Sequence, residues 1–190
     1  MKESVWQVPF YDVRFGPFER KALLEVFESN WLTMGPKVKE FESKFSERTT
    51  RAAENAVAVS SATAALHLSL LCADIGPGDE VLCPSLTFVA TANVIKLVGA
   101  TPVFIDIESE DHWNLSISDM EAKITPRTKA VMAVHYAGFP CRMNEILKLK
   151  KKHGLTVIED SAHACFTSYG KSVLGSIADF GCFSFFSNKN

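Results

Sequence analysis

Apolar residues along this chain fall into short runs that are separated by segments of helical periodicity. The runs predict six β-strands, at residues 56–60, 80–83, 101–106, 129–136, 155–159 and 180–186. Most runs are apolar throughout instead of alternating with polar positions, which is typical of strands buried on both faces of a parallel sheet. We therefore expect an α/β fold with a mostly parallel sheet and helices on both of its faces.

Helical spacing of apolar residues fills the gaps between these strands. It predicts helices at residues 62–73, 87–98, 118–124 and 143–153, two of which end at a glycine. Before the first strand, the pattern predicts a helix at residues 18–29 and a second one that begins at Pro36. The chain is thus expected to divide into an N-terminal helical segment, residues 1–50, and an α/β domain, residues 51–190.

The composition of the chain limits the kinds of binding partner that we expect. The chain of 190 residues is 47% hydrophobic and 22% charged, as globular proteins are, and its net charge of −2 gives no reason to expect nucleic acid or an anionic membrane as a partner. No apolar run reaches the roughly 20 residues of a membrane helix, and the N-terminus lacks the apolar core of a signal peptide. The five cysteines form no CxxC pair and read as buried thiols, so we expect a cytoplasmic protein.

Small and polar residues follow four of the predicted strands, at residues 60–63, 84–88, 160–163 and 187–189. Ligands of open α/β sheets bind beyond the carboxyl ends of the strands. Since parallel strands end at the same edge of the sheet, we expect these four segments to converge on one site.

Two of these segments carry groups suited to covalent chemistry. Lys189 leaves an apolar strand, and a desolvated lysine amine is a good nucleophile for an aldehyde; by itself it would be read as a surface lysine. Asp160 follows another strand and could favour protonation of a pyridine nitrogen, although an Asp here could also simply cap a helix. Glu159 should point to the opposite face of its strand and is the weaker candidate.

The other two segments, with Ser184, could hold a phosphate and a ring. Ser61, Ala62 and Thr63 open a predicted helix, whose N–H groups suit a phosphate dianion or a plain N-cap. Ser184 could add a hydroxyl to the same phosphate or be a buried strand serine. Phe88 could stack on a ring or belong to the core.

His163 could contact a ring oxygen, although a lone histidine is more often structural. An amine, an acid and a phosphate-binding helix start are together what binding of pyridoxal phosphate requires. Other site motifs are missing from the sequence: it contains no GxGxxG, no phosphate-loop lysine, no zinc-type His/Cys spacing and no GxSxG.

At this level of detail the chain resembles the DegT/DnrJ/EryC1/StrS family of nucleotide-sugar aminotransferases that depend on pyridoxal phosphate. The matching segments cover nearly the whole chain in order, at residues 31–36, 59–67, 76–81, 84–93, 125–130, 134–138, 158–164 and 183–190. The resemblance implies the large domain of fold type I, the aspartate-aminotransferase-like fold, in a homodimer. It also implies amino transfer, usually from L-glutamate, to a keto group of a nucleotide-linked sugar, as in polysaccharide biosynthesis.

The resemblance assigns roles to residues that match the family's motifs. It implies that Lys189 forms the internal aldimine, that Asp160 binds the pyridine nitrogen and that His163 lies by the ring. It further implies ring stacking by Phe88, and three phosphate contacts, from Ala62, Thr63 and Ser184. Thr33 and Gly35 match a loop that tends to line the sugar pocket, and a lysine at 189 argues against the dehydratase branch, which has histidine there.

Members of the family continue beyond the position of Asn190 with the rest of the large domain and a C-terminal small domain, which this chain lacks. We therefore expect an incomplete large domain and a poorly active or inactive isolated chain. Two alternatives stay open: a non-catalytic truncated paralogue that acts as a binding or regulatory partner, and an α/β ligand-binding module without covalent chemistry.

Overall fold

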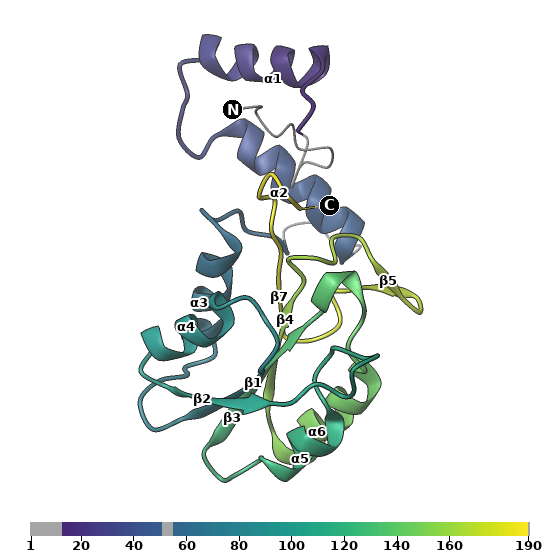
Figure 1. Cartoon of the computed structure of the whole chain (residues 1–190). Coiled ribbons are helices and arrows are strands. Elements are labelled where there is room, and N and C mark those ends of the chain that lie inside the picture. The colour runs from purple at the N-terminus through teal and green to yellow at the C-terminus, as the bar shows by residue number, and fades with distance from the viewer. Residues whose placement is uncertain (1–12, 51–54, 190) are drawn as a thin grey trace, which may run out of the picture.

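A five-stranded sheet with all strands parallel forms the centre of the structure, a computed structural model that describes residues 13–50 and 55–189 (Figure 1). The strand order is β2-β1-β3-β4-β7. The strands are β1 (Glu80–Pro84), β2 (Thr101–Ile105), β3 (Thr128–Val134), β4 (Thr156–Asp160) and β7 (Phe180–Cys182). Two further strands, β5 (Ser168–Tyr169) and β6 (Ser172–Val173), pair separately as a small antiparallel ribbon.

Helices cover both faces of the sheet. On one face lie α3 (Ala62–Cys72) and α4 (Ala90–Leu97), and on the other lie α5 (Ile117–Ala122) and α6 (Met143–His153). Successive residues of a strand point to opposite faces, so Val81 packs with the α3 and α4 side chains, whereas Leu82 packs with those of α5 and α6. This arrangement confirms the predicted α/β fold and explains why the strand sequences are apolar throughout.

Two N-terminal helices lie beyond one end of the sheet, α1 (Pro17–Glu28) and α2 (Pro36–Thr49) (Figure 1). Both begin at the proline that follows a glycine, as the sequence indicates for the second helix. No residue of α1 is buried, whereas α2 buries Phe45, Ser46 and Thr49. The division of the chain at residue 50 stays a prediction.

An aromatic cluster packs α2 against residues 183–185, which precede Lys189 in the chain. It consists of Phe41, Phe45, Phe166, Phe183 and Phe185. The ring of Phe45 lies at its centre, 4.9 Å from Phe183 and 5.5 Å from Phe185 between centroids. Edge-on aromatic pairs of this kind stabilise beyond the apolar area that they bury.

The strand predicted at residues 56–60 is wrong. These residues pair with no strand of the described chain, and Val57 is 78% exposed. Without a neighbouring ladder, side chains of α2 take the backbone donors: the Ala58 N–H donates to Glu42 Oε1 at 2.8 Å, and the Asn55 N–H to Ser46 Oγ at 3.0 Å. An apolar run predicts a strand only where a partner strand accepts its hydrogen bonds.

The strand predicted at residues 180–186 is wrong beyond Cys182. Cys182 pairs with Asp160, the last residue of β4, so the ladder ends there, and the rings of Phe183 and Phe185 pack against Phe45. The helix predicted at residues 87–98 also begins late, at Ala90. The other predicted helices and strands are confirmed to within two residues at each end.

All five cysteines are free thiols, and three of them, Cys83, Cys141 and Cys182, are buried as the sequence predicts. Burial raises the pKa of Cys83 and that of Cys182 to about 12, so these thiols stay protonated. The expectation of burial is wrong for Cys72, which lies exposed at the end of α3. Within the described ranges, no helix combines the length and the apolar character that a membrane crossing requires.

Replacing Phe45 with alanine tests the aromatic cluster. Phe45→Ala should lower the free energy of unfolding by about 3 kcal/mol, because it leaves a cavity among four other rings. Phe139→Ala, at a ring that is 69% exposed, should change it by less than about 0.5 kcal/mol. Urea denaturation followed by tryptophan fluorescence measures both, and equal effects of the two substitutions would contradict a stabilising role for the cluster.

Candidate active site

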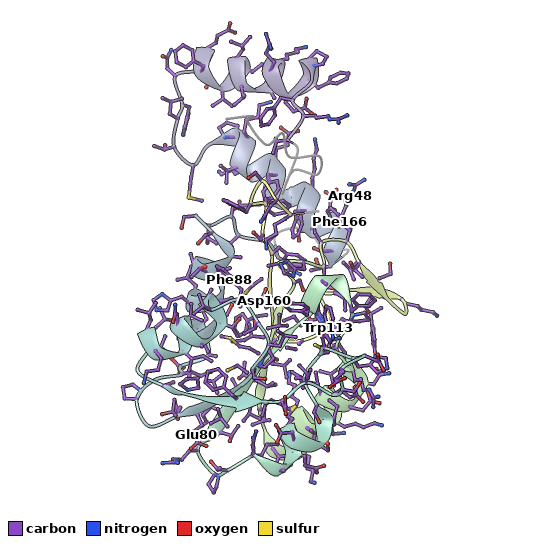
Figure 2. The ribbon with its side chains drawn as sticks, in the orientation of Figure 1. Arg48, Glu80, Phe88, Trp113, Asp160 and Phe166 are labelled. Atoms are coloured by element: carbon purple, nitrogen blue, oxygen red, sulfur yellow. The ribbon has the colours of Figure 1, made fainter. Side chains whose placement is uncertain are left out.

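A cavity of about 310 Å³ lies at the edge of the sheet where the parallel strands end. Figure 2 shows Asp160 and Phe88 toward this edge and Glu80, at the start of β1, at the opposite one. The cavity is lined by every residue predicted to hold a cofactor, namely Ala62, Thr63, Phe88, Asp160, His163, Ser184 and Lys189. Their convergence follows from the common direction of the strands.

Lys189 reaches the cavity from a turn after β7, in which its backbone N–H donates to the Phe186 carbonyl at 2.8 Å. Its Nζ lies 2.8 Å from Nε2 of His163. His163 is only partly exposed, and burial lowers the pKa of its ring from the ordinary value, so the ring is neutral near pH 7. A lysine amine and a neutral imidazole therefore form the reactive end of the cavity.

Asp160 is the last residue of β4 and is 7% exposed. Burial raises the pKa of this carboxyl group, whereas the Ala162 N–H, which donates to its Oδ1 at 3.1 Å, and the nearby Lys189 side chain act in the opposite direction. A protonated ring nitrogen placed beside it would favour the ionised form further. A cationic ligand beside Asp160 would therefore stabilise the ionised form of this buried carboxyl group.

The N-terminus of α3 faces the same cavity through Ser61, Ala62 and Thr63. The Ser61 side chain accepts a hydrogen bond from the Ala64 N–H at 3.1 Å, which is the N-cap that the sequence allows. The cap engages one of the first N–H groups, and the positive end of the helix dipole remains directed at the cavity. Ser184, which is 9% exposed, lies opposite and accepts from the Phe186 N–H at 3.3 Å.

Phe88 does not belong to the core. Its side chain is 69% exposed at the rim of the cavity, which excludes the structural alternative for this residue. An exposed ring beside a cavity is available to stack on a flat ligand.

Two further residues line the cavity: Tyr136, which sequence reasoning missed, and Asn188, which belongs to the predicted site segment 187–189 but was given no role of its own. The Oδ1 atom of Asn188 is buried without a hydrogen-bond partner, which marks a place for a donor on a ligand. Tyr136 was missed because the predicted strand at residues 129–136 included it, whereas β3 ends at Val134 and leaves Tyr136 beyond the strand end.

A buried, hydrogen-bonded pair of side chains supports the floor of the site. His135, the residue after β3, places Nε2 3.1 Å from Oε2 of Glu159, and both side chains are 0% exposed. Burial tends to raise the pKa of Glu159, but hydrogen bonds from His135 and from the backbone N–H groups of Gly175, Ala178 and Ile177 outweigh it, so that the pKa is lowered. Glu159 points away from the cavity, as expected, and anchors the loop before β7.

Thr33 and Gly35 do not line this cavity. They lie in the connection between α1 and α2, where Thr33 is exposed and Gly35 is buried against the Trp31 ring; a Cβ at Gly35 would lie 2.8 Å from Trp31 Cδ1. Their part in a sugar pocket stays a prediction.

A larger cavity, of about 810 Å³, lies between α2, residues 55–62 and residues 175–186. Asp179 is the one titratable side chain among the residues that line it, and it is engaged by Lys150 and by the Val157 N–H. The smaller cavity is therefore the candidate active site, because it gathers the reactive groups.

The parallel sheet, the helices on its two faces and the position of this cavity define the large domain of a fold type I transferase, a class of enzymes that use pyridoxal phosphate. The family model of the DegT/DnrJ/EryC1/StrS aminotransferases matches residues 14–190. The chain belongs to that family.

Two curated relatives are similar in sequence. The spore coat polysaccharide biosynthesis protein SpsC of Bacillus subtilis (strain 168) is 48% identical, over 96% of this chain and 46% of the relative. GDP-perosamine synthase of Escherichia coli O157:H7 is 43% identical, over 96% of this chain and 50% of the relative. The chain thus spans about half the length of the curated relatives that it matches.

Solved structures agree with this assignment. One similar structure is that of Spr1654 from Streptococcus pneumoniae, named a putative sugar aminotransferase, in its pyridoxal-phosphate form. Its sequence is 35% identical to this chain. The match has a TM-score of 0.89 and covers 97% of this chain and 50% of that one. The aminotransferase TlmJ of Streptoalloteichus hindustanus is 38% identical with a TM-score of 0.90, over 96% of this chain and 50% of that one.

Replacing Glu159 with glutamine tests the support beneath the site. Glu159→Gln turns one of the two acceptor oxygens into a donor that faces N–H groups, and should lower the free energy of unfolding by about 3 kcal/mol at pH 7. Because the folded-state pKa is lowered, the contribution is present above the unfolded value of about 4.3 and is lost as the pH falls through the folded value.

Urea denaturation between pH 3 and 8 measures this difference. Glu121→Gln, at an exposed pair with Lys152, should change the stability little over the same range. A difference between wild type and Glu159→Gln that stays constant down to pH 3 would contradict the ionised Glu159.

Proposed function

We propose that this chain carries the cofactor-binding half of an aminotransferase that uses pyridoxal phosphate and transfers an amino group from L-glutamate to the keto group of a nucleotide-linked sugar. The observation that carries the proposal is the convergence of the Lys189 amine, the Asp160 carboxyl group and the N-terminus of α3 on one cavity. Membership of the aminotransferase family and the pyridoxal-phosphate and pyridoxamine-phosphate forms of a similar structure support it.

The described residues fit this cofactor. When bound, pyridoxal phosphate supplies an aldehyde that condenses with an amine and a ring that withdraws electrons from the substrate. Lys189 would present the amine, and Asp160 would favour a proton on the ring nitrogen, since its carboxyl group favours a cationic neighbour. The N-terminus of α3 and the Ser184 hydroxyl would hold the phosphate, and Phe88 would offer its ring for stacking.

The substrate class is proposed from the relatives. One of them is named for a GDP-linked sugar and another for the polysaccharide of a spore coat. We assign the contacts of the sugar to the connection that carries Thr33 and Gly35, in the assembled protein. Catalysis in the cytoplasm is part of the same proposal.

Addition of pyridoxal phosphate to the purified chain tests the cofactor assignment. The wild type should develop a visible absorbance band of the lysine-linked cofactor, and Lys189→Ala should abolish it. Lys171→Ala, at an exposed lysine in the turn between β5 and β6, should leave it unchanged. A band that persists in Lys189→Ala would overturn the proposed function.

Asp160→Asn should weaken cofactor binding about 10- to 1,000-fold, because the amide no longer favours the protonated ring by the one to three pKa units that a carboxylate provides. Fluorescence titration with pyridoxal phosphate measures the affinity. The matched control is Asp111→Asn, at an exposed loop residue remote from the cavity. An unchanged affinity in Asp160→Asn would contradict the role of this carboxyl group.

We further propose that the protein forms a homodimer through α1. Its apolar side chains are exposed, including Phe18 at 84% and Phe27 at 72%, and a second copy is the partner that the family resemblance implies. Sedimentation velocity should show twice the chain mass of 21.0 kDa, and Phe18→Glu with Phe27→Glu should shift the protein to the monomer. Lys21→Glu on the same helix should not, and a monomeric wild type at every concentration would contradict the proposal.

A further inference from the structure

The ring of Trp113 lies outside the core and next to the candidate active site. Its side chain is 51% exposed, and Figure 2 shows it on the other side of Asp160 from Phe88. The ring meets that of Tyr136 edge-on at 5.9 Å between centroids, and Tyr136 lines the 310 Å³ cavity. We call these two residues, Trp113 and Tyr136, the aromatic ledge.

The aromatic ledge is continuous with the reactive end of the cavity. Tyr136 meets the His163 ring edge-on at 6.0 Å between centroids, and His163 Nε2 lies 2.8 Å from the Lys189 Nζ. Both ring contacts fall within the distances at which aromatic side chains pack. A row of neighbouring side chains therefore joins Trp113 to the lysine amine, and a substrate that reacts at Lys189 has this surface beside it.

A closely bonded loop between residues 107 and 115 carries Trp113. The loop is closed where the Glu108 N–H donates to the Asn114 carbonyl at 2.9 Å. The Trp113 Nε1–H donates to the Glu110 carbonyl at 2.7 Å, which satisfies the one polar atom of the ring and fixes its orientation. The exposed part of the ring is thus left for an apolar, flat contact.

The side chain of Asn114 fixes this loop to the 3₁₀ turn η1 (Tyr136–Gly138). Its Nδ2 donates to the carbonyls of residues 139 and 140, at 3.2 and 2.8 Å, and its Oδ1 accepts from the Tyr136 N–H at 3.3 Å. The two rings of the aromatic ledge are therefore held relative to each other before any ligand arrives. A surface that is ordered in advance loses less conformational freedom on binding.

The size of the cavity leaves the nucleotide of the proposed substrate outside it. At about 310 Å³ the cavity lies at the lower limit for small-molecule sites. Under the proposed function the cofactor occupies this volume, so only the reacting part of the substrate reaches Lys189. The nucleotide then lies on the adjoining surface, where the aromatic ledge offers an exposed ring.

We propose that Trp113 stacks on the base of the nucleotide-linked substrate, and that Tyr136 continues this surface toward the reacting end. Any nucleobase has a π face that can stack on an aromatic side chain. The inference rests on the proposed function and identifies the part of the chain that binds the nucleotide. Trp113 is a binding residue in this account, because it touches the substrate away from the reacting atoms.

Titration calorimetry of the purified chain with GDP and with UDP, a purine and a pyrimidine nucleotide, tests the stacking. At least one of them should bind the wild type, and Trp113→Leu should weaken that binding about tenfold, as expected for the loss of one stacked base. Trp113→Phe keeps a flat ring and should retain most of the affinity. The matched control is Phe104→Leu, at a 48% exposed ring on β2, which should leave the affinity unchanged.

Equal affinities of the wild type and Trp113→Leu would overturn the inference, as would the failure of both nucleotides to bind the wild type. Neither probe carries the sugar, so a ledge that stacks on a sugar ring instead would also give equal affinities. The visible band of the lysine-linked cofactor, recorded on the same proteins, separates this inference from the proposed function. Its absence from the wild type refutes the cofactor assignment, whereas its presence together with equal nucleotide affinities refutes the role of Trp113 alone.

Discussion

The common direction of the five strands is the constraint on which the site depends. In a parallel sheet every strand ends at the same edge, so the residues that follow β4 and β7 meet there although more than 20 positions separate them in sequence. The register between β4 and β7 pairs Asp160 with Cys182 and so sets where the chain to Lys189 departs. A slip of one residue would turn the Asp160 side chain to the other face of the sheet.

Packing on both faces holds this geometry in place. The apolar side chains of α3 and α4 on one face and of α5 and α6 on the other bury the central strands β1, β3 and β4 almost completely. Outside the sheet, two groups of contacts hold the chain. The aromatic cluster around Phe45 positions residues 183–186, and the buried pair of His135 and Glu159 holds the loop at residues 175–178. The chain that carries Lys189 is thus held before β7 by Glu159 and after β7 by the aromatic cluster.

Sequence reasoning predicted most of this architecture because the periodicity of apolar residues reports burial directly. It also located Asp160, Lys189 and the start of α3, since each follows a strand end and strand ends converge. It failed at residues 56–60, where an apolar run lacks a partner strand, and beyond Cys182, where β4 ends and the apolar side chains pack against α2 instead. Individual hydrogen bonds could not be predicted from the sequence. The contact between Ala137 and His163, for example, depends on a left-handed backbone conformation that no residue pattern indicates.

The central claim is that Lys189 is the residue to which the cofactor becomes attached in this cavity. Incubation of the purified chain with pyridoxal phosphate, reduction with borohydride and peptide mass spectrometry locate the attachment. The account predicts one stoichiometric adduct, on the peptide that contains Lys189. An adduct distributed over exposed lysines, or one placed on a different residue, would contradict it.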